Sequence, residues 1–158
     1  VTIHANTVLG ADAFYYKNRV TGFDKLISAG RVVLEDHVDL GASCTIDRGV
    51  TGDTTIGRGT KIDNQVHVGH DTHIGKKCLI AAQTGIAGCT VIEDEVTIWG
   101  QVGIISSVLI EKGTVLMAQT GVTKSLKKDI YYGTPQLPYR QKLRETIYLK
   151  NIVNAQKK

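Results

Sequence analysis

The stretch that decides the fold runs from Ile56 to Val122 and reads IGRGTKIDNQVHVGHDTHIGKKCLIAAQTGIAGCTVIEDEVTIWGQVGIISSVLIEKGTVLMAQTGV. Every sixth residue of it is aliphatic without exception, from Ile56 to Val122. The fourth residue after each of these has a small, thiol or β-branched side chain until Leu126 ends the series. A period of six fits neither an α-helix of 3.6 residues per turn nor a continuous strand, whose side chains alternate with a period of two.

A period of six is typical of a chain that turns a corner every six residues and stacks coil upon coil. Three such hexads form one triangular coil, so residues 18 apart stack at roughly 4.8 Å, the spacing of paired strands. The sequence therefore predicts an all-β fold, a parallel β-helix built from hexapeptide repeats.

Repeat-like hexads also occur before this stretch. Two begin at Ile3 and Leu9, so we expect the array to extend upstream of the first residue, and others fill residues 34–46. Residues 15–31 interrupt the array with an aromatic and basic loop insertion, which we expect to pack on a neighbouring subunit or to line a substrate site. The register then slips by four residues before Ile56, so we assign no stacking partners in that earlier part.

A different pattern follows the ladder. Turn signals at Gly133 and Pro135 precede an apolar stripe with helical spacing that begins at about Tyr139. We therefore predict a β-helix domain over residues 1–130 and a C-terminal turn and α-helix over residues 131–158.

The composition excludes several classes of protein. The 158 residues carry 19 Lys and Arg against 15 Asp and Glu, an excess too small to predict nucleic-acid binding. No apolar run approaches the roughly 18 residues of a membrane span, and no secretory leader precedes the first hexad. The odd number of cysteines (Cys44, Cys78 and Cys89) indicates reduced thiols. We expect a cytoplasmic protein without stable membrane insertion.

Three of the five histidines, His67, His70 and His73, lie close together in the sequence. Such a group first suggests zinc, but these residues occupy different positions of two hexads and need not converge. The zinc enzymes built on this kind of solenoid, the γ-class carbonic anhydrases, pair histidines as His-x4-His, a spacing that is absent here. The sequence predicts no metal.

His70 is better placed as a general base. The residue 18 positions further on is Gly88, so the imidazole faces a strip without side chains, where a substrate has room. Asp63 is expected to lie around one edge of the triangle and to accept the Nδ1 hydrogen, which leaves Nε2 as the proton acceptor. The Gly88 N–H would stabilise an oxyanion. An incidental surface histidine is the alternative interpretation.

Several segments form a set that is more specific than the hexads. They are Thr45-Ile46-Asp47-Arg48-Gly49, Asp53-Thr54-Thr55-Ile56-Gly57, Ile62-Asp63-Asn64-Gln65, Gly69-His70, Ile74-Gly75, Gly85-Ile86-Ala87-Gly88 and Tyr132-Gly133-Thr134-Pro135. Together they resemble the UDP-3-O-acylglucosamine N-acyltransferases of lipid A biosynthesis. The resemblance covers nearly the whole chain from Leu9 onward.

The resemblance implies a left-handed β-helix and a homotrimer with active sites between subunits. It also implies transfer of a 3-hydroxyacyl chain from acyl carrier protein to the 2-amino group of a UDP-linked glucosamine. No cofactor is implied beyond the acyl-phosphopantetheine of the donor. The outward basic residues that would suit an acidic carrier protein are Lys76, Lys77, Lys124, Lys127, Arg140, Lys142 and Arg144.

The resemblance also assigns roles to residues. His70 matches the general base of the family, Asp63 its partner and Gly88 the oxyanion donor. The residues that match its substrate-binding set are Arg48, Asn64 and Gln65.

This chain departs from the family in two ways. Many members have a second histidine where this chain has Ser107, so a role in acyl or phosphopantetheine handling is not assigned to that position. Full-length members also have an N-terminal domain that grips the uridine, which these residues do not include. We therefore expect weak or no activity from this chain alone, since binding energy far from the reacting atoms drives catalysis.

Two other functions stay open. One is a smaller hexapeptide acetyltransferase that uses acetyl-CoA on another amino sugar, although such enzymes lack the pairing of Asp-Arg-Gly with Asp-Asn-Gln. The other is a non-catalytic trimeric scaffold. Loss of acyl transfer in a His70→Ala variant would separate an enzyme from a scaffold.

Overall fold

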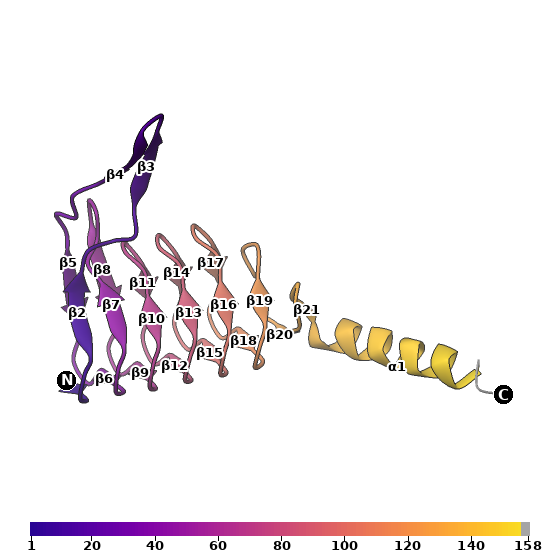
Figure 1. Ribbon diagram of the computed structural model, residues 1–158. Coiled ribbons are helices and arrows are strands. Elements are labelled where there is room, and N and C mark those ends of the chain that lie inside the picture. The colour runs from indigo at the N-terminus through magenta and orange to yellow at the C-terminus, as the bar shows by residue number, and fades with distance from the viewer. Residues whose placement is uncertain (156–158) are drawn as a thin grey trace.

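Short parallel strands stack coil upon coil into a solenoid with three faces (Figure 1). The computed structural model describes the backbone of residues 1–155 and the side chains of residues 1–153. Residues 18 apart pair as expected: His67 pairs with Gly85, which in turn pairs with Gly103. The predicted hexapeptide-repeat β-helix is confirmed, and its form is consistent with the left-handed type.

Each face is one sheet. Face 1 contains β1 (Thr2–Ile3), β6 (Asp39–Leu40), β9 (Lys61–Ile62), β12 (Leu79–Ile80), β15 (Thr97–Ile98), β18 (Val115–Leu116), β20 (Ile130–Tyr132) and β21 (Leu137–Pro138). Face 2 contains β2 (Val8–Ala11), β7 (Thr45–Asp47), β10 (His67–Val68), β13 (Gly85–Ile86), β16 (Gly103–Ile104) and β19 (Gly121–Val122). Face 3 contains β5 (Arg31–Leu34), β8 (Asp53–Ile56), β11 (His73–Ile74), β14 (Val91–Ile92) and β17 (Leu109–Ile110).

The aliphatic ladder forms the core. Ile56, Ile86 and Ile110 are fully buried, and each such side chain contributes about 1.5–3 kcal/mol of hydrophobic free energy. The threonines four residues further on are buried too, and their hydroxyls bond to the backbone. Thr60 Oγ1 donates to the Gly75 carbonyl at 2.8 Å, and Thr90 Oγ1 donates to the Ala87 carbonyl at 2.8 Å. Small polar residues are therefore tolerated at the corners of the core because their hydroxyls are satisfied.

Most corners of the triangle contain a residue with positive φ, such as Asp71 at 52° and Cys89 at 59°. This conformation is uncommon for a residue with a side chain, and hydrogen bonds between coils help to hold it. The Cys89 N–H, for example, donates to the His70 carbonyl at 2.8 Å. One corner bears a ladder of glutamines whose side-chain amides bond to one another at 2.8–3.0 Å, namely Gln65, Gln83, Gln101 and Gln119.

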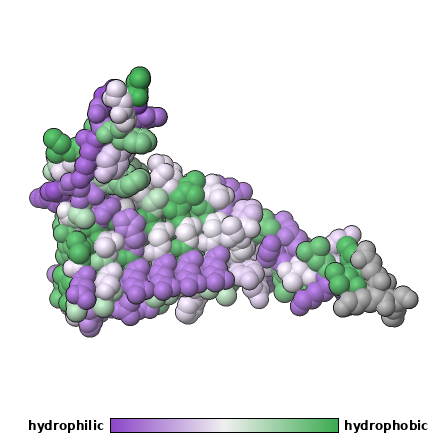
Figure 2. Space-filling model, in the orientation of Figure 1, coloured by the Kyte–Doolittle hydropathy of each residue, from purple (hydrophilic) through white to green (hydrophobic). Residues whose placement is uncertain are grey.

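The loop insertion is an ordered arm. Within residues 15–31 it forms an antiparallel hairpin of β3 (Tyr16–Arg19) and β4 (Gly22–Lys25), which projects beyond the coils (Figure 1). Apolar side chains are exposed along it (Figure 2), including Val20, Phe23 and Ile27.

The register slip before Ile56 also has a simple form. Leu34 pairs with Ile56, 22 residues ahead instead of 18. The four extra residues are accommodated in a corner loop around residues 49–52, between β7 and β8.

The solenoid gives way to the helix in two steps. β20 continues face 1, and β21 folds back antiparallel to it. The predicted helix follows as α1 (Tyr139–Ala155), which extends away from the last coil (Figure 1). Residues 156–158 of the predicted C-terminal segment lie outside the described residues. No helix in the described part of the chain is both long and apolar enough to cross a membrane.

Candidate active site

An open groove of about 790 Å³ runs along face 2. Its floor is formed in part by Gly85, Gly103 and Gly121, which stack on one another in register. A Cβ atom added at Gly85 or Gly103 would meet nothing within 4 Å, whereas one at Gly121 would lie 2.9 Å from Thr134 Cγ2. The groove is therefore open along its length and closes near Thr134.

His70 lies at one end of this groove, at the corner that follows β10. Its side chain is 13% exposed. A Cβ atom added at Gly88 would lie 2.6 Å from His70 Nε2, so only glycine allows the ring to lie where it does. The structure thus brings His70 and Gly88 together. The Tyr15 ring packs edge-on against the imidazole with a centroid separation of 5.6 Å, which connects the arm to the groove.

Asp71 is the hydrogen-bond partner of His70, with Nδ1 and Oδ2 2.8 Å apart. The carboxylate also accepts the N–H groups of Val50 and Gly52 at 2.8 Å and that of Thr51 at 3.3 Å. Burial raises the pKa of Asp71, but these backbone bonds and the bond from His70 outweigh it and lower that pKa to about 2. A carboxylate that is charged at neutral pH accepts from Nδ1–H and leaves Nε2 free to accept a proton.

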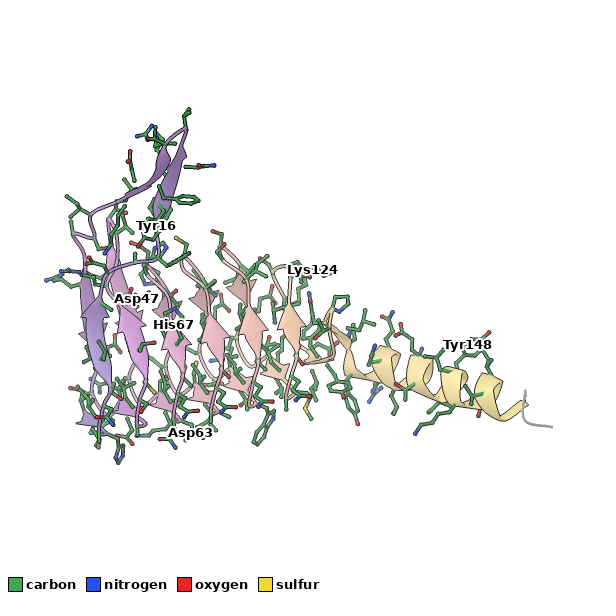
Figure 3. The ribbon with its side chains drawn as sticks, viewed as in Figure 1. Tyr16, Asp47, Asp63, His67, Lys124 and Tyr148 are labelled. Carbon is green, nitrogen blue, oxygen red and sulfur yellow. The ribbon has the colours of Figure 1, made fainter. Side chains whose placement is uncertain are left out.

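The prediction that Asp63 accepts the Nδ1 hydrogen is wrong in this structure. Asp63 follows β9 on face 1, and its Oδ1 accepts the N–H of Asn64 at 2.7 Å. In Figure 3 it lies at the lower edge of the coils, whereas Asp47 and His67 lie midway along them. The physical reason is the corner between the two hexads, which turns the chain from face 1 to face 2 between Asp63 and His70.

The three predicted substrate-binding residues do not line the groove. Arg48 is bound to Asp12, with Nη2 and Oδ1 2.6 Å apart. Asp12 also binds Lys25 of the arm at 2.7 Å, so Arg48 helps to hold the base of the arm. Asn64 accepts the Ala42 N–H at 2.7 Å, and Gln65 is the first member of the glutamine ladder.

Two further polar residues face the groove from β7 and β10 (Figure 3). His67 Nε2 lies 3.8 Å from Asp47 Oδ2, and its Nδ1 is 2.9 Å from Thr45 Oγ1. Burial raises the pKa of Asp47, which is 6% exposed, and the neighbouring histidines oppose that rise. Sequence spacing did not reveal this pair because the four-residue slip makes Thr45 the partner of His67 across 22 residues.

Comparisons with known proteins agree with this architecture. The sequence profile described as bacterial transferase hexapeptide (six repeats) matches residues 53–88. A UDP-3-O-acylglucosamine N-acyltransferase of Agrobacterium fabrum is 51% identical over 70 residues, which are 44% of this chain and 20% of that relative. The one from Sinorhizobium medicae is 52% identical over 71 residues, with the same shares. The match thus spans about a fifth of the length of these curated relatives.

Solved structures have the same fold. A UDP-N-acetylglucosamine acyltransferase from Francisella novicida superposes with a TM-score of 0.77 at 22% identity. The superposition covers 91% of this chain and 53% of the Francisella novicida chain. A hexapeptide-repeat acetyltransferase from Vibrio cholerae, complexed with acetyl coenzyme A, gives 0.61 at 25% identity, covering 68% of this chain and 69% of its own. The curated relatives and these structural neighbours are all named as acyltransferases or acetyltransferases.

Proposed function

We propose that this chain is the catalytic β-helix of an N-acyltransferase acting on a UDP-3-O-acylglucosamine, with a 3-hydroxyacyl chain delivered by acyl carrier protein. The observation that carries the proposal is the His70 imidazole, oriented by Asp71 and lying against Gly88 in an open groove. The names and identities of the curated relatives support the substrate class.

In the proposed reaction the 2-amino group of the sugar attacks the thioester carbonyl of the donor. His70 Nε2 accepts a proton from the attacking nitrogen, and Asp71 stabilises the imidazolium that forms. The thiol of the donor leaves as the amide bond is completed. The Gly88 N–H donates no hydrogen bond to any residue that the structure describes. It would therefore be free to donate to the developing oxyanion. No step of this scheme uses a metal.

The rest of the groove suits an extended apolar chain. Its lining combines the glycine floor with the exposed side chain of Ile105, over a backbone whose inward side chains, Ile86 and Ile104, belong to the core. We infer that the acyl chain lies along this floor, because a strip without side chains leaves room over three successive coils. The apolar ring of Phe14 and that of Tyr15 line the end near His70, where they would cover the reacting thioester.

We further propose that the chain acts as a cytoplasmic homotrimer. The basic residues on its outer surface, including Lys76, Lys124 and Arg140, would attract an acidic carrier protein. Metal is not part of the proposal, and the UDP-sugar would be gripped in part by residues outside this chain.

The proposal is tested by incubating the protein with 3-hydroxyacyl carrier protein and the UDP-linked amine, with product detected by mass spectrometry. We expect an amide product whose formation falls by roughly 10²–10⁴-fold in His70→Ala, the usual contribution of a general base. Light scattering on both proteins checks that the trimer is unchanged. Product formed from acetyl-CoA alone would favour the acetyltransferase alternative, and equal rates in the two proteins would favour a scaffold.

A further inference from the structure

Cys89 brings a thiol to the His70–Asp71 pair. One ring nitrogen of His70, a carboxylate oxygen of Asp71 and Cys89 Sγ all lie within 4.8 Å of one another. Cys89 lines the groove and is exposed, whereas Cys44 and Cys78 are buried in the core. The proposed acyl transfer uses His70 and Asp71 but has no role for this thiol.

The three groups are held by the scaffold. Asp71 is fixed by three backbone N–H donors from the corner loop at residues 49–52. Cys89 occupies the corner of the next coil, where its N–H donates to the His70 carbonyl at 2.8 Å. Because both corners belong to stacked coils, the thiol and the carboxylate stay near the imidazole without an ordering step.

An imidazole, a carboxylate and a thiol are the three ligand types of protein zinc sites. A bound divalent cation would neutralise the negative charges of the Asp71 carboxylate and of a Cys89 thiolate, which otherwise repel each other.

We propose that His70, Asp71 and Cys89 form a binding site for a thiophilic divalent cation of the zinc type. Two ligands about 2 Å from a tetrahedral ion are roughly 3.3 Å apart, so the 2.8 Å His70–Asp71 contact has to open only slightly. Cys89 Sγ lies within 4.8 Å of both groups and would approach the ion by rotation of its side chain. On binding, the thiol loses its proton to solvent and the ring proton of His70 moves from Nδ1 to Nε2 by way of solvent, while a water molecule in the open groove completes the coordination.

This cation is not a cofactor of the proposed reaction. A cation on Nδ1 would keep the ring proton on Nε2, the atom that serves as the base, and would engage Asp71, so zinc would inhibit acyl transfer. That consequence rests on the proposed function, whereas the binding site itself does not.

The test uses the metal ions alone, added to the reduced protein. Titration calorimetry with Zn²⁺ is expected to give one site per chain. Co²⁺ is expected to give thiolate-to-metal charge-transfer absorption together with the strong visible bands of tetrahedral coordination. In Cys89→Ser the charge-transfer absorption should vanish and the Zn²⁺ affinity should fall by about tenfold or more, as for disrupted metal sites generally.

His73→Asn is the matched control, because His73 lies on face 3, outside the groove. Its Zn²⁺ affinity should equal that of the unchanged protein. Cys89→Ala serves as a second variant, and circular dichroism checks that both cysteine variants fold. A Zn²⁺ affinity and a Co²⁺ spectrum that are the same with and without the Cys89 thiol would overturn the proposal, even if acyl transfer were demonstrated.

Discussion

Gly88 controls where the His70 ring can lie. A methyl group at this position would come within 2.6 Å of Nε2 and within 3 Å of two ring carbons, so the imidazole would have to shift. We therefore predict that Gly88→Ala displaces the imidazole and lowers kcat for acyl transfer by roughly a hundredfold or more. Steady-state kinetics would measure the loss. Gly100→Ala is the matched control, since Gly100 does not line the groove and a Cβ atom there would lie at an ordinary 3.4 Å from the Ala82 carbonyl.

Asp71 positions His70 through Nδ1, so its charge matters more than its shape. We predict that Asp71→Asn lowers kcat by about a hundredfold while KM changes little, because the substrate contacts are kept. Asp63→Asn should lower kcat less, since Asp63 lies on face 1. The reverse order of the two variants would show that the resemblance, and not the single-chain geometry, identifies the partner of the base.

The single-residue predictions from sequence succeeded where they relied on stacking and failed where they relied on distance around a corner. The 18-residue step placed Gly88 against His70 correctly. The spacing of seven residues between Asp63 and His70 predicts a short path around one edge of the triangle. The partner in the structure is instead Asp71, the next residue in the chain. A corner carries the chain from one face of the triangle to the next. The hexad pattern shows only which residues point inward, and not how outward side chains on two faces are oriented relative to each other.

Among the elements, the glycine floor of face 2 has the most direct consequence for specificity. Leucine at position 103 would project into the groove midway between β13 and β19. We predict that Gly103→Leu shortens the longest acyl chain that is transferred, with little effect on shorter chains. Competition among carrier-protein thioesters of different lengths, resolved by mass spectrometry, would measure this. An unchanged chain-length profile would place the acyl chain elsewhere.

The elements themselves were predictable to different degrees. The coils from Ile56 onward and the helix near Tyr139 followed from spacing alone, because inward side chains and apolar stripes are imposed by the core. The pairing of β5 with β8 did not follow from spacing, since four additional residues break the 18-residue step. The hairpin of the arm was also not foreseen. Every residue of β3 and β4 is exposed, so neither strand has an inward face that would leave a periodic signal in the sequence.

At the scale of the whole molecule, acidic pH should weaken the fold partly through Asp71. Its folded-state pKa of about 2 lies below the ordinary 3.8, so the unfolded chain binds more protons between these values. The stabilisation is complete above about pH 4 and is lost as pH falls toward 2. Denaturant titrations at a series of pH values would show the free energy of unfolding declining across this window. In Asp71→Asn the decline should be shallower. Parallel curves for the two proteins would contradict the assignment.

The corner loop at residues 49–52 affects both the site and the solenoid. It supplies the backbone N–H groups that hold Asp71. These four surplus residues are also what breaks the regular step of the solenoid. An engineer who deleted them to perfect the repeat would obtain a more uniform β-helix, and would at the same time release the carboxylate that orients His70. A perfectly regular repeat would therefore lack the loop that orients the proposed catalytic histidine. The interruption of the six-residue period is itself part of the candidate active site.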